Sequence, residues 1–261
     1  MNSKNIKTVF VSGLIAASTI VPTAVLAQSP STSTSTNKGF CNQVTNASTR
    51  LSQNIADRES KLNAKRIERT TDLTNKKNQQ TDRLAADRAK WDTNRKEQFT
   101  KLDARGKSDA QKQAIAAFEQ AVTNAIAARR AAVDAANKDY RAGVDAAIAS
   151  RKSAVDSAIA TFQSSVNAAV SKAQSDCASG TDPKTVRQTL QDSLKAARDK
   201  LQSDLKAIDK TGATIQTLQA TRKAAVDKAF ADFKAAVEAA RTTLKAALGS
   251  TTASASPSAT K

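Results

Sequence analysis

The sequence predicts an all-α protein, built as a long antiparallel helical hairpin or three-helix bundle with eleven-residue repeats and flexible termini. Apolar residues recur every eleven positions through most of the chain. Aromatic residues make up only 3% of it, too few for the usual packed core of a globular protein of 261 residues. Alanine is abundant, while leucine, isoleucine, valine and phenylalanine are sparse, which favours long helices over a compact α/β domain.

The N-terminal 27 residues have the pattern of a secretory signal peptide. Lys4 and Lys7 precede an apolar run at 9–21, and Pro22 and a small-residue pattern ending at Ala27 follow it. We therefore expect cleavage near Ala27 and an exported protein, whether periplasmic, on the cell surface or secreted. The alternative is that the segment is kept as an anchor. No later stretch is apolar over the ~18 residues that a membrane span requires.

Two segments are expected to be disordered. Residues 28–40 form a Ser/Thr-rich linker, and residues 249–261 form a Ser/Thr/Ala-rich tail. Neither composition can bury enough apolar surface to offset the entropy lost on ordering.

Three long helices are predicted between these ends, each with its own eleven-residue series. Eleven residues span three turns at about 3.67 residues per turn, so an apolar stripe with this period stays on one face of a nearly straight helix. The series are Leu51, Leu62, Leu73 and Leu84; then Val122, Val133, Val144, Val155 and Val166; then Ile215, Val226, Val237 and Leu248.

The breaks between the helices carry capping signals. Ser108 with Gln111 three residues later is a capping box. Gly180 suits the end of a helix, Asp182 the N-cap of the next one and Pro183 its first turn. These signals place helices near 42–105, 108–177 and 183–248, in a hairpin domain at 41–178 and a third helical segment at 179–248. Whether the third helix continues or breaks near residue 212 is left open, because Gly212 occupies a stripe position there.

The two cysteines stand at the open end of the predicted hairpin. Cys41 lies at the start of the first helix and Cys177 at the end of the second. In an oxidising compartment this arrangement favours a disulfide that staples the two helices. Two unrelated thiols or an intermolecular bridge are the alternatives.

No constellation of catalytic residues is visible in the sequence. The chain has no histidine, the commonest general base and a frequent metal ligand. It also has no Gly-rich phosphate loop, and its carboxylates are scattered singly among basic residues, as on a solvated helix face. We therefore expect no enzyme activity, no cofactor and no metal site.

The positive charge is the main clue to a partner. The formal net charge is +17; segment 42–105 carries 15 basic and 9 acidic residues, 107–178 carries 9 and 7, and 179–261 carries 14 and 8. Such surfaces attract polyanions in a salt-dependent way. The alternative is that the charge serves solubility. The candidate basic surface comprises Lys61, Lys65, Arg66, Arg69, Lys76, Lys77, Arg129, Arg130, Arg151, Lys152, Arg222 and Lys223.

The repeats carry a resemblance. The segments Val-Asp-Ala-Ala-Ile at 144–148 and Val-Asp-Ser-Ala-Ile at 155–159, with the signal peptide and the paired cysteines, resemble uncharacterised exported alanine-rich coiled-coil proteins of bacteria. That resemblance implies no particular activity. The chain is also similar to the periplasmic Skp chaperone family, which is basic, exported and built with helical hairpin arms, although the strand-rich trimerising body of that family has no counterpart here.

These observations favour a non-enzymatic, rod-like coiled-coil protein of the cell envelope, with a structural or binding role. Its basic helical surface would meet an anionic envelope polymer, another protein or, nonspecifically, nucleic acid. The alternatives are a Skp-like extracytoplasmic holdase chaperone and an amphipathic binder of lipid surfaces. The sequence leaves open the identity of the partner and the oligomeric state.

Overall fold

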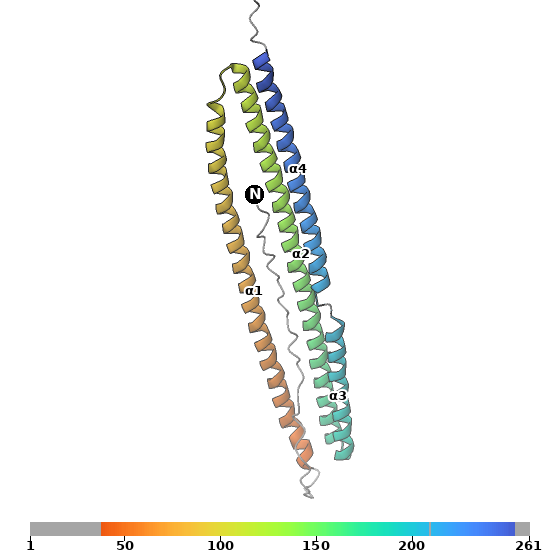
Figure 1. The fold of residues 1–261 in the computed structure, drawn as a ribbon. Helices are drawn as coiled ribbons and strands as arrows, with labels where there is room; N and C mark the ends of the chain where they lie inside the picture. The colour runs from red at the N-terminus through yellow and green to blue at the C-terminus, as the bar shows by residue number, and fades with distance from the viewer. Residues whose placement is uncertain (1–37, 209, 254–261) are drawn as a thin grey trace, which may run out of the picture. The chain divides into compact units, whose positions relative to one another are not determined.

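Four helices account for nearly all of the chain that the structure, a computed structural model, describes, namely residues 38–208 and 210–253. They are α1 (Lys38–Asp103, 66 residues), α2 (Asp109–Ala178, 70 residues), α3 (Pro183–Ala207, 25 residues) and α4 (Gly212–Ala253, 42 residues) (Figure 1). No strand occurs in these residues. The all-α fold predicted from the sequence is confirmed.

The local signals at the helix ends act as expected. The backbone N–H of Gln111 donates to Ser108 Oγ and the backbone N–H of Ser108 donates to Gln111 Oε1, both at 3.3 Å, which completes a reciprocal capping box before α2. The Asp182 side chain accepts a hydrogen bond from the backbone N–H of Thr185 at 3.0 Å, and Pro183 opens α3. Gly180, with a φ of 77°, ends α2 in the left-handed conformation that glycine favours.

The outer bounds of the helices differ from the predicted disordered segments. Helix α1 begins at Lys38, inside the predicted linker 28–40. Phe40 packs against a buried apolar cluster there, and this apolar contact offsets the entropy lost when the segment becomes helical. Helix α4 continues to Ala253, so residues 249–253 of the predicted tail are helical. The predicted signal peptide at 1–27 and the rest of both predicted disordered segments lie outside the described residues.

The third predicted helix is two helices. Ile208 adopts an extended backbone (φ −69°, ψ 123°) after α3, and Thr211 has a φ of 62°, a left-handed conformation that is unusual for a β-branched residue. Gly212 then begins α4. The break that the sequence left open near residue 212 is therefore present, a few residues earlier.

The chain divides into two units, and the first contains residues 1–66 and 148–212. Among its described residues, α1, α2 and α3 contribute to one apolar cluster, and Phe40, Leu51, Ile55, Cys177 and Leu205 pack against it. The cluster comprises Val44, Ala158, Phe162, Val166, Ala169, Val170, Ala173, Val186, Leu190, Leu194, Ala197 and Leu201.

The disulfide lies in this first unit. Cys41 of α1 and Cys177 of α2 are bonded, their Cα atoms are 5.8 Å apart, and 136 positions of sequence separate them. The predicted pairing is confirmed. A loop of this length gives up to ~5 kcal/mol of stabilisation in the chain-entropy account.

The second unit contains residues 67–147 and 213–261, and its described core is made of smaller side chains. Its buried apolar residues are Ile115, Val122, Ala125, Ala136, Val144, Ala229 and Ala240. Small residues let α2 and α4 approach closely: a Cβ added to Gly143 would lie 2.6 Å from a methyl carbon of Leu218. Within the described residues, no helix is both long and apolar enough to cross a membrane.

Candidate functional site

The residues of the predicted basic surface do not share one face of their helices. Consecutive residues of an α-helix point about 100° apart, so neighbours in sequence do not share a face. On α1, Lys65 and Lys76 are exposed, whereas the residues that directly follow them, Arg66 and Lys77, are partly buried and make ion pairs with α2. The basic pairs of the sequence are therefore not basic patches in the fold.

The inward cations of α1 meet aspartates of α2. In the second unit, Lys77 donates to both carboxylate oxygens of Asp145 (2.7 and 2.9 Å), and Arg88 donates to both oxygens of Asp134 (2.9 and 2.6 Å). Lys77 and Arg88 are eleven positions apart on α1, and Asp134 and Asp145 are eleven positions apart on α2. Lys77, one of the cations of the predicted basic surface, is thereby neutralised within the fold.

The first unit holds a similar contact. Arg66 pairs with Asp156 of α2 at 2.7 Å, and Lys152 pairs with the same carboxylate at 2.7 Å. Burial raises the pKa of Asp156, but the hydrogen bonds from Lys152 and Arg66 outweigh it and leave this pKa below its ordinary value. Arg66 and Lys152 are thus both paired with a carboxylate of the chain itself.

Arg151 is not part of any surface, which corrects the prediction from the sequence. Its side chain is buried, with the residue only 8% exposed. The physical reason is its register: Arg151 lies eleven residues before the buried Phe162, so both occupy the same face of α2.

The pair Arg129 and Arg130 is also split. Arg130 faces α1 and donates to both oxygens of Asp92 at 2.9 and 2.6 Å. This hydrogen bond, with a further one from Arg95, lowers the pKa of Asp92 to about 2, although desolvation opposes it, and it raises the pKa of Arg130. Arg129 instead extends toward α4, where its guanidinium lies 4.3 Å from the centre of the Phe233 ring.

Arg222 and Lys223 of α4 separate in the same manner. Arg222 donates to the Asn137 side-chain oxygen of α2 at 2.6 Å and lies over the Tyr140 ring at 5.5 Å. Lys223 is exposed and pairs with Asp227 of its own helix.

Four of the predicted cations remain exposed without an ion pair or side-chain hydrogen bond among the described residues. Lys61 and Lys65 belong to the first unit, and Arg69 and Lys76 to the second. All four lie on α1; Lys61 and Lys65 are four residues apart, and Arg69 and Lys76 are seven apart, so within each unit the two cations share a face of the helix. Glu68 and Asp72 are also exposed in this stretch, so cations outnumber acids by four to two.

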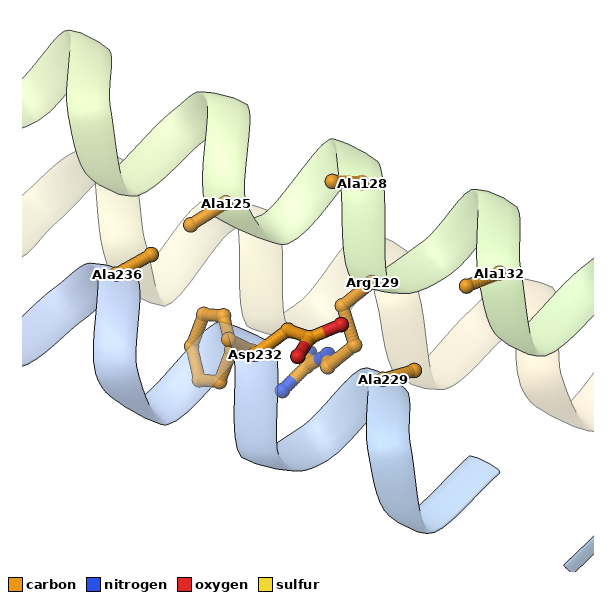
Figure 2. Close-up of a pocket in the computed structure, with 8 residues that line it drawn as sticks. Ala125, Ala128, Arg129, Ala132, Ala229, Asp232 and Ala236 are labelled. Carbon is orange, nitrogen blue, oxygen red and sulfur yellow. The ribbon is translucent and has the colours of Figure 1, made fainter. Parts of the chain in front are cut away.

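A cavity in the second unit was not predicted from the sequence. It lies between α2 and α4, has a volume of about 200 Å³, and is lined by alanines of both helices, with Arg129, Asp232 and Phe233. Figure 2 shows the Arg129 side chain reaching from α2 toward α4 beside these alanines. The signal that could have found it is the eleven-residue register, since Arg129, Tyr140, Arg151 and Phe162 occupy one series.

The described residues hold no cluster of three or more acidic or cysteine side chains suited to a metal ion. Comparison of the chain with protein-family models, with curated proteins and with solved structures finds no match.

Proposed function

We propose that this chain is a non-enzymatic, exported helical protein of the cell envelope that binds a linear anionic polymer through α1. The candidate polymer-binding residues are Lys61 and Lys65 in the first unit and Arg69 and Lys76 in the second. Export is supported by the signal-peptide pattern of residues 1–27.

The observation that carries this proposal is the contrast between the two faces of α1. Its inward cations Arg66, Lys77 and Arg88 have side chains only 21–31% exposed and are each paired with an aspartate. The four outward cations are exposed and have no carboxylate partner among the described residues. Cations that the fold does not use are available to neutralise an external anion.

The order of the ion pairs along the two helices supports an antiparallel arrangement of α1 and α2. Lys77 pairs with Asp145 and Arg88 with Asp134, so partner numbers on α2 fall as those on α1 rise. We propose that the repeat sets this register, because a stripe with an eleven-residue period keeps one face of a straight helix toward its neighbour. Lys65 and Lys76 directly precede Arg66 and Lys77, so they point about 100° away from these inward cations around α1.

The test uses heparin as a soluble linear polyanion and measures its affinity at several salt concentrations. The test variant changes four outward cations together: Lys61→Gln, Lys65→Gln, Arg69→Gln and Lys76→Gln. A control variant with the same change in net charge removes four cations that pair within their own helices: Lys152→Gln, Lys195→Gln, Lys200→Gln and Lys228→Gln.

The negative slope of log affinity against log salt should become shallower by roughly three in the test variant, because each lost phosphate-like contact contributes about 0.7–0.9. The control should retain most of the wild-type slope. Equal losses in the two variants would show that binding follows net charge alone, and absence of heparin binding at low salt would contradict the proposal outright.

A holdase role is the second candidate, and exposed apolar side chains favour it. On the α1 part of the second unit, Ile67 is 68% exposed and Trp91 is 53% exposed. Such side chains could contact an unfolded client. The combined change Ile67→Ser and Trp91→Ser should then abolish suppression of client aggregation, while heparin binding stays unchanged.

A further inference from the structure

We propose that Arg129 and the alanine-lined cavity form a binding site for a short aliphatic carboxylate. This site lies on α2 and α4 of the second unit. It is separate from the outward cations of α1 and does not depend on the function proposed for them.

The Arg129 guanidinium is held in place but not paired. It lies over two rings of α4, 4.3 Å from the Phe233 centre and 5.1 Å from the Phe230 centre. No hydrogen bond or ion pair of Arg129 occurs among residues 38–208 and 210–253. A guanidinium carries five N–H donors in a planar fork that matches a carboxylate, and stacking on rings leaves the edge of that fork available.

The neighbouring arginines of the second unit are hydrogen-bonded, unlike Arg129. Arg130 and Arg88 donate in a bidentate manner to Asp92 and Asp134. Arg222, the comparable stacked arginine between α2 and α4, donates to Asn137. Desolvation, with the nearby charges of Arg130 and Arg88, lowers the pKa of Arg129, so an anion there would relieve an unbalanced positive charge.

The cavity next to this guanidinium is suited to a short apolar chain. Its alanines present methyl groups from both helices: Ala125, Ala128 and Ala132 of α2, and Ala229 and Ala236 of α4 (Figure 2). At about 200 Å³ it is smaller than drug-sized sites, which occupy roughly 300–1,000 Å³. The ligand is therefore a few carbons long, with its charged group at Arg129.

Asp232 limits the charge that the site accepts. Its carboxylate also lines the cavity, and it pairs with Lys228 of its own helix at 2.7 Å. An anion bound at Arg129 would experience repulsion from this carboxylate. The site therefore favours a single negative charge over a doubly charged phosphate.

The test is a calorimetric titration of the full mature chain with four probes. Hexanoate has the proposed charge and chain, hexanol and hexylammonium keep the chain without the anion, and acetate keeps the anion without the chain. Alanine-methyl NMR spectra locate the binding. Hexanoate should bind best and should shift the methyl resonances of Ala128, Ala132 and Ala236.

The variants separate the site from general effects of charge. Arg129→Met should weaken hexanoate binding roughly ten-fold or more, the size expected for a lost charge-assisted hydrogen bond. Arg222→Met is the matched control, a stacked arginine lost from the same pair of helices, and should leave the affinity unchanged. Ala128→Leu should block binding by filling the cavity, and Asp232→Asn should strengthen it severalfold.

Circular dichroism is used to check that each variant folds, and Ala128→Leu and Asp232→Asn test the site even if Arg129→Met does not fold. Equal binding of hexanoate and hexanol, equal losses in Arg129→Met and Arg222→Met, or hexanoate shifts at methyl groups outside the cavity would each overturn the proposal.

Discussion

The two units of the chain share helices α1 and α2 but are stabilised by different interactions. In the first unit, leucines of α3 pack with Phe162 and Val166 of α2 in an apolar cluster, and a disulfide joins α1 to α2. In the second unit, α2 and α4 pack through alanines, and α1 is joined to α2 by ion pairs at Lys77, Arg88 and Arg130. Apolar burial and covalent bonding are insensitive to salt and acid, whereas partly exposed ion pairs are sensitive to both.

The comparison indicates that α1, which has few apolar residues, can stay packed against α2 through ion pairs in the unit that lacks the disulfide and the large apolar cluster. Apolar burial contributes roughly 25 cal/mol per Å², so alanine methyl groups add little compared with leucine side chains. We therefore expect local stability to be higher in the first unit than in the second.

The largest expected effect is loss of the disulfide. The double change Cys41→Ser and Cys177→Ser should lower the free energy of unfolding by about 2–5 kcal/mol, because the unfolded chain regains the freedom that a long closed loop removes. Urea unfolding followed by circular dichroism measures this effect. An unfolding midpoint equal to that of the wild type would contradict the role assigned to the bond.

A matched pair of leucine truncations compares the two units directly. Leu194→Ala in the apolar cluster should cost about 2–5 kcal/mol, because it leaves a cavity among buried side chains. Leu73→Ala on the α1 part of the second unit, which is only partly buried, should cost less than about 2 kcal/mol. Equal costs in urea unfolding would show that the two units are packed alike.

The close approach of α2 and α4 gives the third prediction. Gly143→Val should destabilise the protein by about 1–3 kcal/mol, because the new side chain overlaps Leu218. The added change Leu218→Ala should recover part of that loss. Gly249, whose added Cβ meets nothing within 4 Å, provides the control substitution Gly249→Val, for which we expect no comparable loss in thermal unfolding.

The smallest expected effect is acid weakening of the ion pairs in the second unit. The pKa of Asp92 in the fold is about 2, below its ordinary value of 3.8, because Arg130 favours the charged carboxylate. The stabilisation is therefore fully present above pH 3.8 and is lost as the pH falls through about 2. Hydrogen exchange should show α1 amides near Asp92 losing protection in this range before those of α3.

The variant Asp92→Asn checks the assignment. It should remove most of the acid-dependent change near residue 92 and leave the amides of α3 unaffected. If wild type and variant lose protection over the same pH range, another carboxylate is responsible.

The features that the sequence predicted correctly depend on residues that are close in sequence or that have a single candidate partner in the chain. The caps at Ser108 and Asp182 depend on residues three positions away, so local sequence contains the whole interaction. Cys41 and Cys177 are the only two cysteines, so their pairing involved no choice among partners. Gly212 on an apolar stripe indicated where the third predicted helix could break, but the sequence left open whether it does.

The basic surface could not be predicted correctly from neighbours in sequence. Arg151 and Lys152 are adjacent, but one is buried and the other is exposed, since the helix turns between them. The Arg129 cavity depends on α4 packing beside α2 at Phe233, a long-range relation that composition and charge runs do not contain. Assigning Arg129 and Arg151 to their common eleven-residue series would have placed both arginines at a helix interface and not on the surface.

The equal spacing of two ion pairs would let one of them re-form if α1 slid along α2 by eleven residues. A shift by one repeat would place Lys77 opposite Asp134, or Arg88 opposite Asp145, and so would exchange one aspartate for its equivalent eleven residues away. Cysteine has no such equivalent, because serine stands eleven residues after Cys41 and valine eleven before Cys177. The disulfide thus distinguishes the observed alignment of α1 and α2 from alignments shifted by eleven residues.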